Sequence, residues 1–360
     1  MKIKLFDPYI GKDEEKIIQK ILKSKFWASG AGVGQVLKFE NNFRKFIGAD
    51  SCIAVNSGTA ALNLALSLID IKNKEVILPS LSFVSTAHSI LLNGGIPKFV
   101  DIDPETLCID PELIKKAINK KTKLILPVHF GGFPCNLSEI NKIARNNHCY
   151  VIDDAAHAVG STYNYKKIGT QTFASCFSFH PVKNLAMPTG GLISLNHKNH
   201  KNFTKKLKSL RWCGITNRKS TDYDVDSLGN NYYMNEFSAA IGLVQLKKIN
   251  KITKLRKNIA KRFFNELNIE HKMPFDDNSS YHLYWIRIKN RKKFRDNLNS
   301  KNIETGTHYK PIHNFSFYKK YISLPLTEKV SKEIVTIPIH PNLKDIEIDK
   351  IISSINKLVR

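Results

Sequence analysis

Short apolar runs alternate with helix-like segments between about residues 50 and 195. In the helix-like segments, such as residues 59–69 and 137–147, apolar side chains recur every three or four positions, as on one face of an α-helix. This alternation favours an α/β fold in which helices cover a largely parallel sheet. The runs that we predict to be strands are CIAV, EVILP, PKFVDI, TKLILPV, CYVID and CFSF.

The pattern changes after about residue 235, where longer helical segments replace the short alternation. We therefore predict a large domain, including the N-terminal segment, at residues 1–235 and a smaller α+β domain at residues 236–360. The elements predicted for the small domain are a helix over 235–267, a strand HLYWIRI, a helix around 291–300, a strand near 306–309 and a helix over 345–359.

No run of the chain approaches the roughly 20 apolar residues that a membrane-spanning helix needs. The first residues, MKIKLFDPYIGKDEEK, lack the apolar core of a signal peptide, so we expect a cytoplasmic protein with no membrane partner. The six cysteines form no CxxC pair, so we expect reduced, buried thiols and no metal site.

The formal net charge of +25 allows partners such as nucleic acid, membrane surfaces or anionic small molecules. The lysines are spread along the whole chain, and the densest stretch, residues 247–262, is typical of a helix with a solvated basic face. No RNA- or DNA-binding motif accompanies the charge. We therefore predict no nucleic-acid partner, and a basic nucleic-acid-binding protein stays a remote alternative.

Ligands of parallel sheets bind beyond the carboxyl ends of the strands, so the residues that follow the apolar runs are the candidates for chemistry. The turn Ser57-Gly58-Thr59 opens a helix, where free N–H groups and the helix dipole suit a phosphate, although Ser and Thr also serve there as plain N-caps. Phe83 follows the next run and could stack on a flat ring or belong to the core.

Asp153 and Asp154 end the run CYVI, and His157 follows them. One carboxylate could pair with a protonated ring nitrogen, but a helix cap or a metal ligand would use the same residue types. No further Asp, Glu or His cluster stands nearby in sequence, which disfavours a metal.

Lys183 lies just beyond another apolar run, and a lysine that can lose its proton can form a Schiff base with a carbonyl cofactor. Ser178 could add a phosphate contact, and His180 could line the site. In chain order, the candidates provide a phosphate-binding turn, a stacking ring, an acid and a lysine. Pyridoxal phosphate (PLP) requires this combination.

Nine stretches of sequence carry a resemblance to a known family. The chain resembles, over nearly its whole length, the DegT/DnrJ/EryC1/StrS family of sugar aminotransferases, which are PLP enzymes of fold type I. The resemblance implies an aspartate-aminotransferase-like architecture, with a seven-stranded-type sheet sandwiched by helices in the PLP-binding domain. The stretches include FWASGAGVGQVLKFENNF, AVNSGTAAL, LPVHFGGFPCNL, VIDDAAHAVGS, FSFHPVKN, NNYYMNEFSAAIGLVQL and THYKPIH.

Each candidate takes a role from this resemblance. Lys183 matches the lysine that forms the aldimine, Asp154 matches the acid that faces the ring nitrogen, and His157 matches a residue close to the ring. The match for the stacking aromatic is Phe83, and the matches for the phosphate cup are Gly58, Thr59 and Ser178.

The resemblance also implies partners. Asn231 matches an asparagine that reaches the cofactor phosphate of the neighbouring subunit, which implies a homodimer with shared active sites. His308 and Tyr309 match a loop of the small domain that lies near the sugar-nucleotide substrate, and His180 is a further candidate for substrate binding.

The expected reaction is transfer of an amino group from L-glutamate to a nucleotide-linked keto-sugar, for amino-sugar and surface-glycan biosynthesis. Two departures from the family pattern lie near the site, Pro188-Thr189 before the Gly pair and Tyr233 two residues after Asn231. They leave the sugar and the position of amination open. A sugar dehydratase, in which histidine replaces the lysine, and a PLP-binding regulator without turnover are the alternatives within PLP chemistry.

Overall fold

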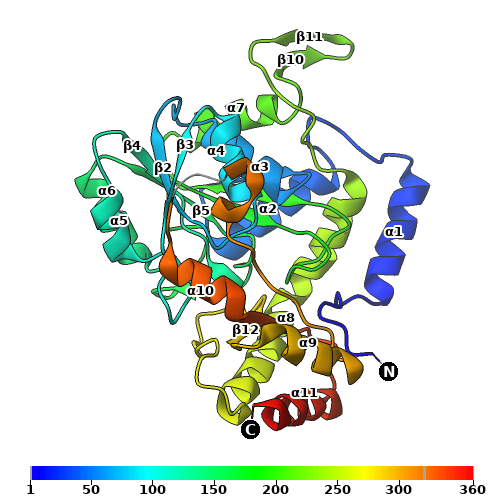
Figure 1. The fold of residues 1–360 in the computed structure, drawn as a ribbon. Coiled ribbons are helices and arrows are strands. Elements are labelled where there is room, and N and C mark those ends of the chain that lie inside the picture. The colour runs from blue at the N-terminus through cyan, green and yellow to red at the C-terminus, as the bar shows by residue number, and fades with distance from the viewer. Residues whose placement is uncertain (1, 319–321, 360) are drawn as a thin grey trace.

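A seven-stranded sheet forms the centre of the computed structural model, which describes residues 2–318 and 322–359 (Figure 1). The strand order is β1-β9-β8-β5-β4-β2-β3. Only β9 runs antiparallel to its neighbours, β1 and β8, so the sheet is mostly parallel, as predicted. The strands are β1 (Ser51–Val55), β2 (Glu75–Pro79), β3 (Ile96–Val100), β4 (Thr122–Ile125), β5 (Tyr150–Asp154), β8 (Ala174–Ser178) and β9 (Gly191–Leu195).

Helices cover both faces of this sheet, because alternate strand residues point to opposite sides. Ile53 and Val55 of β1 enter one apolar cluster with α3, while Ala54 between them enters the other cluster with α2. The helices of this region are α2 (Gln35–Ile47), α3 (Gly58–Leu66), α4 (Ser85–Leu92), α5 (Pro111–Ala117), α6 (Leu137–Asn146) and α7 (His200–Leu210).

The C-terminal region begins with a long helix, α8, that runs from beside α1 and α2 down to α9 and α11 (Figure 1). The predicted helices at 235–267, 291–300 and 345–359 are confirmed. The predicted strand near 306–309 is wrong, because Gly306 forms only a single bridge, to Thr336, and the ladder partner of β12 is β13. The elements are α1 (Lys12–Ser24), α8 (Glu236–Glu266), β12 (Tyr284–Arg287), α9 (Arg291–Ser300), α10 (Pro325–Glu333), β13 (Ile334–Ile337) and α11 (Asp345–Leu358).

Between β12 and α10 the chain returns to the large sheet. Ile312 N–H donates to the Ser80 carbonyl at 2.9 Å, and the Ser80 hydroxyl lies 2.6 Å from His313 Nδ1. At the start of α10, Thr327 N–H donates to Asp101 Oδ1 at 2.7 Å. These bonds tie residues 312–313 to the end of β2 and Thr327 to the end of β3, and so they hold residues 308–309 beside the sheet.

Two short hairpins lie outside the sheet, β6 (Thr162–Tyr163) with β7 (Lys166–Lys167) and β10 (Ile215–Lys219) with β11 (Asp222–Val225). The second hairpin extends from the body of the molecule next to α7 (Figure 1). All six cysteines are free, and four are buried, but Cys149 is partly exposed and Cys213 is exposed, so the expectation of buried thiols fails at these two. No helix among the described residues is both long enough and apolar enough to cross a bilayer.

Candidate active site

A cavity of about 330 Å³ opens at the carboxyl ends of the parallel strands. Of the residues predicted for the site, every one except Asn231 lines it. They come from the start of α3, the last residues of β5 and β8, the loops after β2, β5 and β8, and the segment at residues 308–309. The predicted residues in the wall are Gly58, Thr59, Phe83, Asp154, His157, Ser178, His180, Lys183, His308 and Tyr309.

The N-terminus of α3 forms one wall of the cavity. Ser57 is its N-cap, and the Ser57 hydroxyl accepts the Ala60 N–H at 3.1 Å, so the capping interpretation is confirmed. The first N–H groups of a helix have no partner inside it, so the amides of Gly58 and Thr59 remain open to a ligand. A Cβ on Gly58 would lie 2.8 Å from Ser178 Cβ, so only glycine lets these backbones approach so closely.

Lys183 lies in the turn after β8, with its side chain half-buried in the wall of the cavity. No carboxylate among the described residues lies within 4.0 Å of Nζ, and its polar contact is His282 Nε2 at 3.3 Å. Burial lowers the pKa of Lys183 to about 8, although the charge of Asp154 acts to raise it. About a tenth of the amine is therefore neutral, and nucleophilic, at pH 7.

Asp154 is the last residue of β5, and it lines the cavity. Thr86 Oγ1 donates to its Oδ2 at 2.8 Å, and the Ala156 N–H donates to its Oδ1 at 3.1 Å. Burial raises the pKa of Asp154, while the hydrogen bonds from Ala156 and Thr86 lower it. The two hydrogen bonds thus fix the orientation of the carboxylate, but they do not fully offset the cost of burying its charge. A cationic partner would stabilise that charge further.

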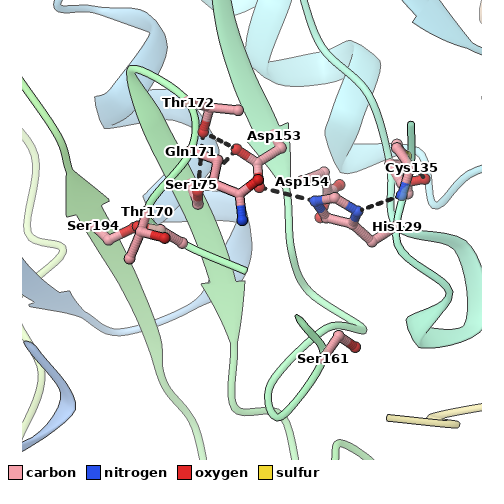
Figure 2. Close-up of polar contacts among 12 residues, drawn as sticks. His129, Cys135, Asp153, Asp154, Ser161, Thr170, Gln171, Thr172, Ser175 and Ser194 are labelled. Atoms are coloured by element: carbon pink, nitrogen blue, oxygen red, sulfur yellow. Dashed lines mark hydrogen bonds and ion pairs between the residues drawn. The ribbon is translucent and has the colours of Figure 1, made fainter. Parts of the chain in front are cut away.

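Asp153 points to the opposite side of β5, into a buried hydrogen-bond network (Figure 2). Its Oδ2 lies 2.9 Å from His129 Nε2, and its Oδ1 accepts hydrogen bonds from the hydroxyls of Ser175, at 2.8 Å, and Thr172. Since the Cys135 N–H donates to His129 Nδ1 at 3.0 Å, the proton of this ring lies on Nε2 and faces Asp153. Asp153 therefore supports the end of β5 from behind and does not line the cavity.

His157 and Tyr309 join the two sides of the cavity. Gly131 N–H donates to His157 Nδ1 at 3.2 Å, which leaves Nε2 to face the Tyr309 hydroxyl at 3.2 Å. Burial and the charge of Lys183 hold the pKa of His157 well below its usual value, so the imidazole is neutral. His308 Nδ1 bonds Thr336 Oγ1 at 2.8 Å, and burial lowers the pKa of His308 to about 4.

The remaining candidates lie at the rim or outside the cavity. Phe83 is 58% exposed, with its ring 6.3 Å from that of Tyr309, so it is not part of the core. Asn231 is exposed and lies outside the cavity, where its carbonyl accepts from Asn56 Nδ2 at 3.2 Å. The departure Thr189 lines the cavity, and its hydroxyl donates to the Asn56 carbonyl.

Sequence reasoning missed several residues of the site. Thr86 and Ser85 lie in the stretch after EVILP, and the only signal for them was their place beyond a strand. His282 contacts Lys183 across 99 positions of sequence, and no motif marked it.

The statistical model of the DegT/DnrJ/EryC1/StrS aminotransferase family matches residues 8–356. The chain belongs to this family. The spore coat polysaccharide biosynthesis protein SpsC of Bacillus subtilis is 34% identical to it over 98% of this chain and 96% of SpsC. The aminotransferase PseC of Helicobacter pylori, involved in the biosynthesis of pseudoaminic acid, shares 28% identity and superposes with a TM-score of 0.93, with 99% of each chain covered. The PLP form of the putative sugar aminotransferase Spr1654 of Streptococcus pneumoniae gives a TM-score of 0.94 at 26% identity, covering 99% of this chain and 98% of Spr1654.

Membership of the DegT/DnrJ/EryC1/StrS family confirms the predicted enzyme class and cofactor, because its members are PLP-dependent sugar aminotransferases. The side chains in the cavity fit PLP. The glycine-lined start of α3 can seat a phosphate beside Ser178, and the buried amine of Lys183 has no carboxylate within salt-bridge distance among the described residues. The buried carboxylate of Asp154 can meet a protonated ring nitrogen.

Proposed function

We propose that this chain transfers an amino group from L-glutamate to the keto group of a nucleotide-linked sugar, in the biosynthesis of a surface glycan. The observation that carries the proposal is the cavity that Lys183, with its pKa lowered to about 8, shares with the buried carboxylate of Asp154. The names of SpsC and PseC, for a spore coat polysaccharide and for pseudoaminic acid, support a glycan product.

PLP, when bound, supplies a carbonyl that reacts with amines and a ring that accepts electrons. In our proposal, Lys183 Nζ would hold the cofactor at rest. As a free amine, Nζ would act as the base that takes the proton from the α-carbon of glutamate and as the acid that gives a proton to the sugar carbon that gains nitrogen.

The other residues bind and orient. The amides of Gly58 and Thr59, with Ser178, hold the phosphate, and the Phe83 ring covers one face of the cofactor. Asp154, fixed by Thr86, keeps the ring nitrogen protonated.

On the open side of the cavity, we assign the neutral imidazole of His157 to a place close to the ring. His308, Tyr309 and His180 then face the sugar nucleotide.

We further propose that the enzyme is a homodimer with shared active sites, because the exposed Asn231 lies outside its own cavity. Asn231 then reaches the cofactor phosphate of the neighbouring subunit. Mixed dimers test this arrangement. Lys183→Ala and Asn231→Ala chains, each inactive alone, should regain activity when mixed, because one of the two sites then contains neither substitution. Mixing without recovery would contradict a shared site.

The first test of the reaction is the absorbance spectrum of the purified protein with PLP. We expect a visible band that borohydride traps on Lys183, located by peptide mass spectrometry, and that disappears on addition of L-glutamate. A keto-sugar nucleotide that restores the band identifies the acceptor. A band that no amino donor changes would favour a regulator, and absence of a band would refute the proposal and favour the nucleic-acid alternative.

A further inference from the structure

His282, just before β12, is a buried side chain that the proposed reaction does not yet use. Its Nε2 lies 3.3 Å from Lys183 Nζ, and its Nδ1 has no hydrogen-bond partner among the described residues. The ring is 1% exposed. The amino group of Lys183 is therefore the single polar contact of this imidazole within the described part of the chain.

The segment that carries His282 is fastened to the loops around the cavity. The next residue, Leu283, donates its N–H to the Gly131 carbonyl at 3.1 Å. Asn184, the neighbour of Lys183 in sequence, donates from Nδ2 to the Ser280 carbonyl at 3.0 Å. The backbone on both sides of the Lys183–His282 contact is thus tied together.

The His282 ring itself is held between two aromatic neighbours. It stacks on Phe6 with the ring centroids 5.9 Å apart and the planes 19° from parallel, and it lies 4.4 Å from the ring of His157. Packing against these two rings and a fixed backbone leave the imidazole little freedom to move away from the lysine.

In the proposed function, Lys183 leaves the cofactor during every turnover and must return to it. A free lysine side chain has many rotamers, and confining it to one costs conformational entropy, which a hydrogen bond to a fixed partner can offset. We propose that His282 is a positioning residue that holds the released amino group of Lys183, accepting a hydrogen bond from Nζ at Nε2. This inference rests on the proposed role of Lys183 as the residue that bonds PLP.

The charges around the pair support this direction of the hydrogen bond. Burial, and to a lesser extent the charge of Lys183, hold the pKa of His282 well below its usual value. The imidazole is therefore neutral and can accept a hydrogen bond. A hydrogen-bond acceptor stabilises the ammonium form of Lys183 and so raises its pKa, whereas burial favours the neutral amine and lowers the pKa. The other titratable groups that face the pair are Asp154, His157, His180, His308 and Arg256.

The test measures the amine of Lys183 directly in the full-length protein after removal of PLP. Trace labelling with acetic anhydride across a pH series, followed by mass spectrometry of the Lys183 peptide, gives the pH at which half of the amine is neutral. We expect a midpoint near pH 8 in the wild type. His282→Phe removes the acceptor and should lower the midpoint by about one pH unit, the size expected for one charge-assisted hydrogen bond.

Matched variants separate positioning from a general loss of structure. His282→Gln can offer an amide oxygen at a similar place, so its midpoint should return toward the wild-type value. His282→Met is of similar size without a nitrogen acceptor, and it should shift the midpoint like His282→Phe even if the phenylalanine variant folds poorly. His271→Phe, at an exposed histidine of the same region, should leave the midpoint unchanged.

An unchanged or raised midpoint in both His282→Phe and His282→Met would overturn this inference. The same measurement needs neither a sugar nor an amino donor, so its failure would leave the proposed function standing. Conversely, failure of borohydride to trap PLP on Lys183 in the wild type would refute the proposed function whatever the labelling shows.

Discussion

Replacing Asp153 by alanine removes the acceptor at the centre of the buried network behind β5 (Figure 2). Three donors converge on this carboxylate, His129 Nε2 at 2.9 Å, Ser175 Oγ at 2.8 Å and the Thr172 hydroxyl. His129 cannot present its other nitrogen instead, because Nδ1 already accepts the Cys135 N–H. The substitution therefore leaves donors without an acceptor in a region that excludes water.

The expected loss of stability follows from these contacts. A buried donor that is left without a partner costs about 1–3 kcal/mol, and here His129 and Ser175 both lose their acceptor. The Thr172 hydroxyl can fall back on the Ala174 carbonyl at 3.1 Å, so the sum is smaller than three full penalties. We expect Asp153→Ala to lower the free energy of unfolding by about 2–6 kcal/mol, the cost of two unsatisfied buried donors. Asp153→Asn keeps one oxygen for His129 and should cost about 1 kcal/mol.

Urea unfolding of the PLP-bound enzyme, followed by circular dichroism at fixed protein and PLP concentrations, measures this difference as a shift of the midpoint. The control is Asp349→Ala, which removes an exposed carboxylate that pairs with Arg262 at 2.7 Å and should cost less than about 1 kcal/mol. If Asp153→Ala unfolds at the same urea concentration as this control, the network does not stabilise β5 and the reasoning is wrong.

Three further predictions concern the cavity. Gly58→Ala places a Cβ 2.8 Å from Ser178 Cβ and should weaken PLP binding at least about tenfold, a change of about 1.4 kcal/mol, in a spectroscopic titration. Gly11→Ala, where an added Cβ meets nothing within 4 Å, should bind PLP as the wild type does. Only the neutral amine attacks an aldehyde, so the rate of PLP loading should rise with pH and level off above the pKa of Lys183 at about 8; a rate that is flat between pH 6 and 9 would contradict this. Phe83→Ala removes an exposed stacking ring and should weaken PLP binding about tenfold with little change in the urea midpoint, whereas a large loss of stability would mean that the ring serves packing instead.

The sequence predicted the large domain well because its signals are local. Each apolar run corresponds to a strand of the sheet, and the residues that follow the runs meet at the cavity because parallel strands end at the same edge. The long helix α8 and helix α9 were also clear from their apolar period. The division into domains at residue 235 stays a prediction.

What the sequence missed depends on contacts between distant segments. Strand β9 carries no signal that separates an antiparallel strand from its parallel neighbours, and its first residue, Gly191, has space only for hydrogen because a Cβ would lie 2.2 Å from the Ser57 carbonyl oxygen. The segment at 306–309 has a strand-like sequence pattern. After Gly306, which bridges to Thr336 of β13, it leaves the two-stranded sheet of β12 and β13 and reaches the cavity. His282 reaches Lys183 only because the segment before β12 folds back against the turn after β8.

The adjacent carboxylates of Asp153 and Asp154 show how one strand supplies both the chemistry and its support. Neighbouring residues of a strand point to opposite faces, so one carboxylate must leave the cavity if the other enters it. The sequence alone leaves open which one enters. The structure decides it through the donors on each side. Buried hydroxyl and imidazole groups saturate the Asp153 carboxylate, while the Asp154 carboxylate accepts two hydrogen bonds from the described residues and keeps lone pairs for a cationic partner. The backbone N–H of His129 donates to the backbone carbonyl of Asp154 at 3.2 Å. His129 therefore pairs with Asp153 through its side chain and fixes the backbone of Asp154 as well. A change at Asp153 should therefore reach the cofactor through the position of Asp154, although Asp153 itself does not line the cavity.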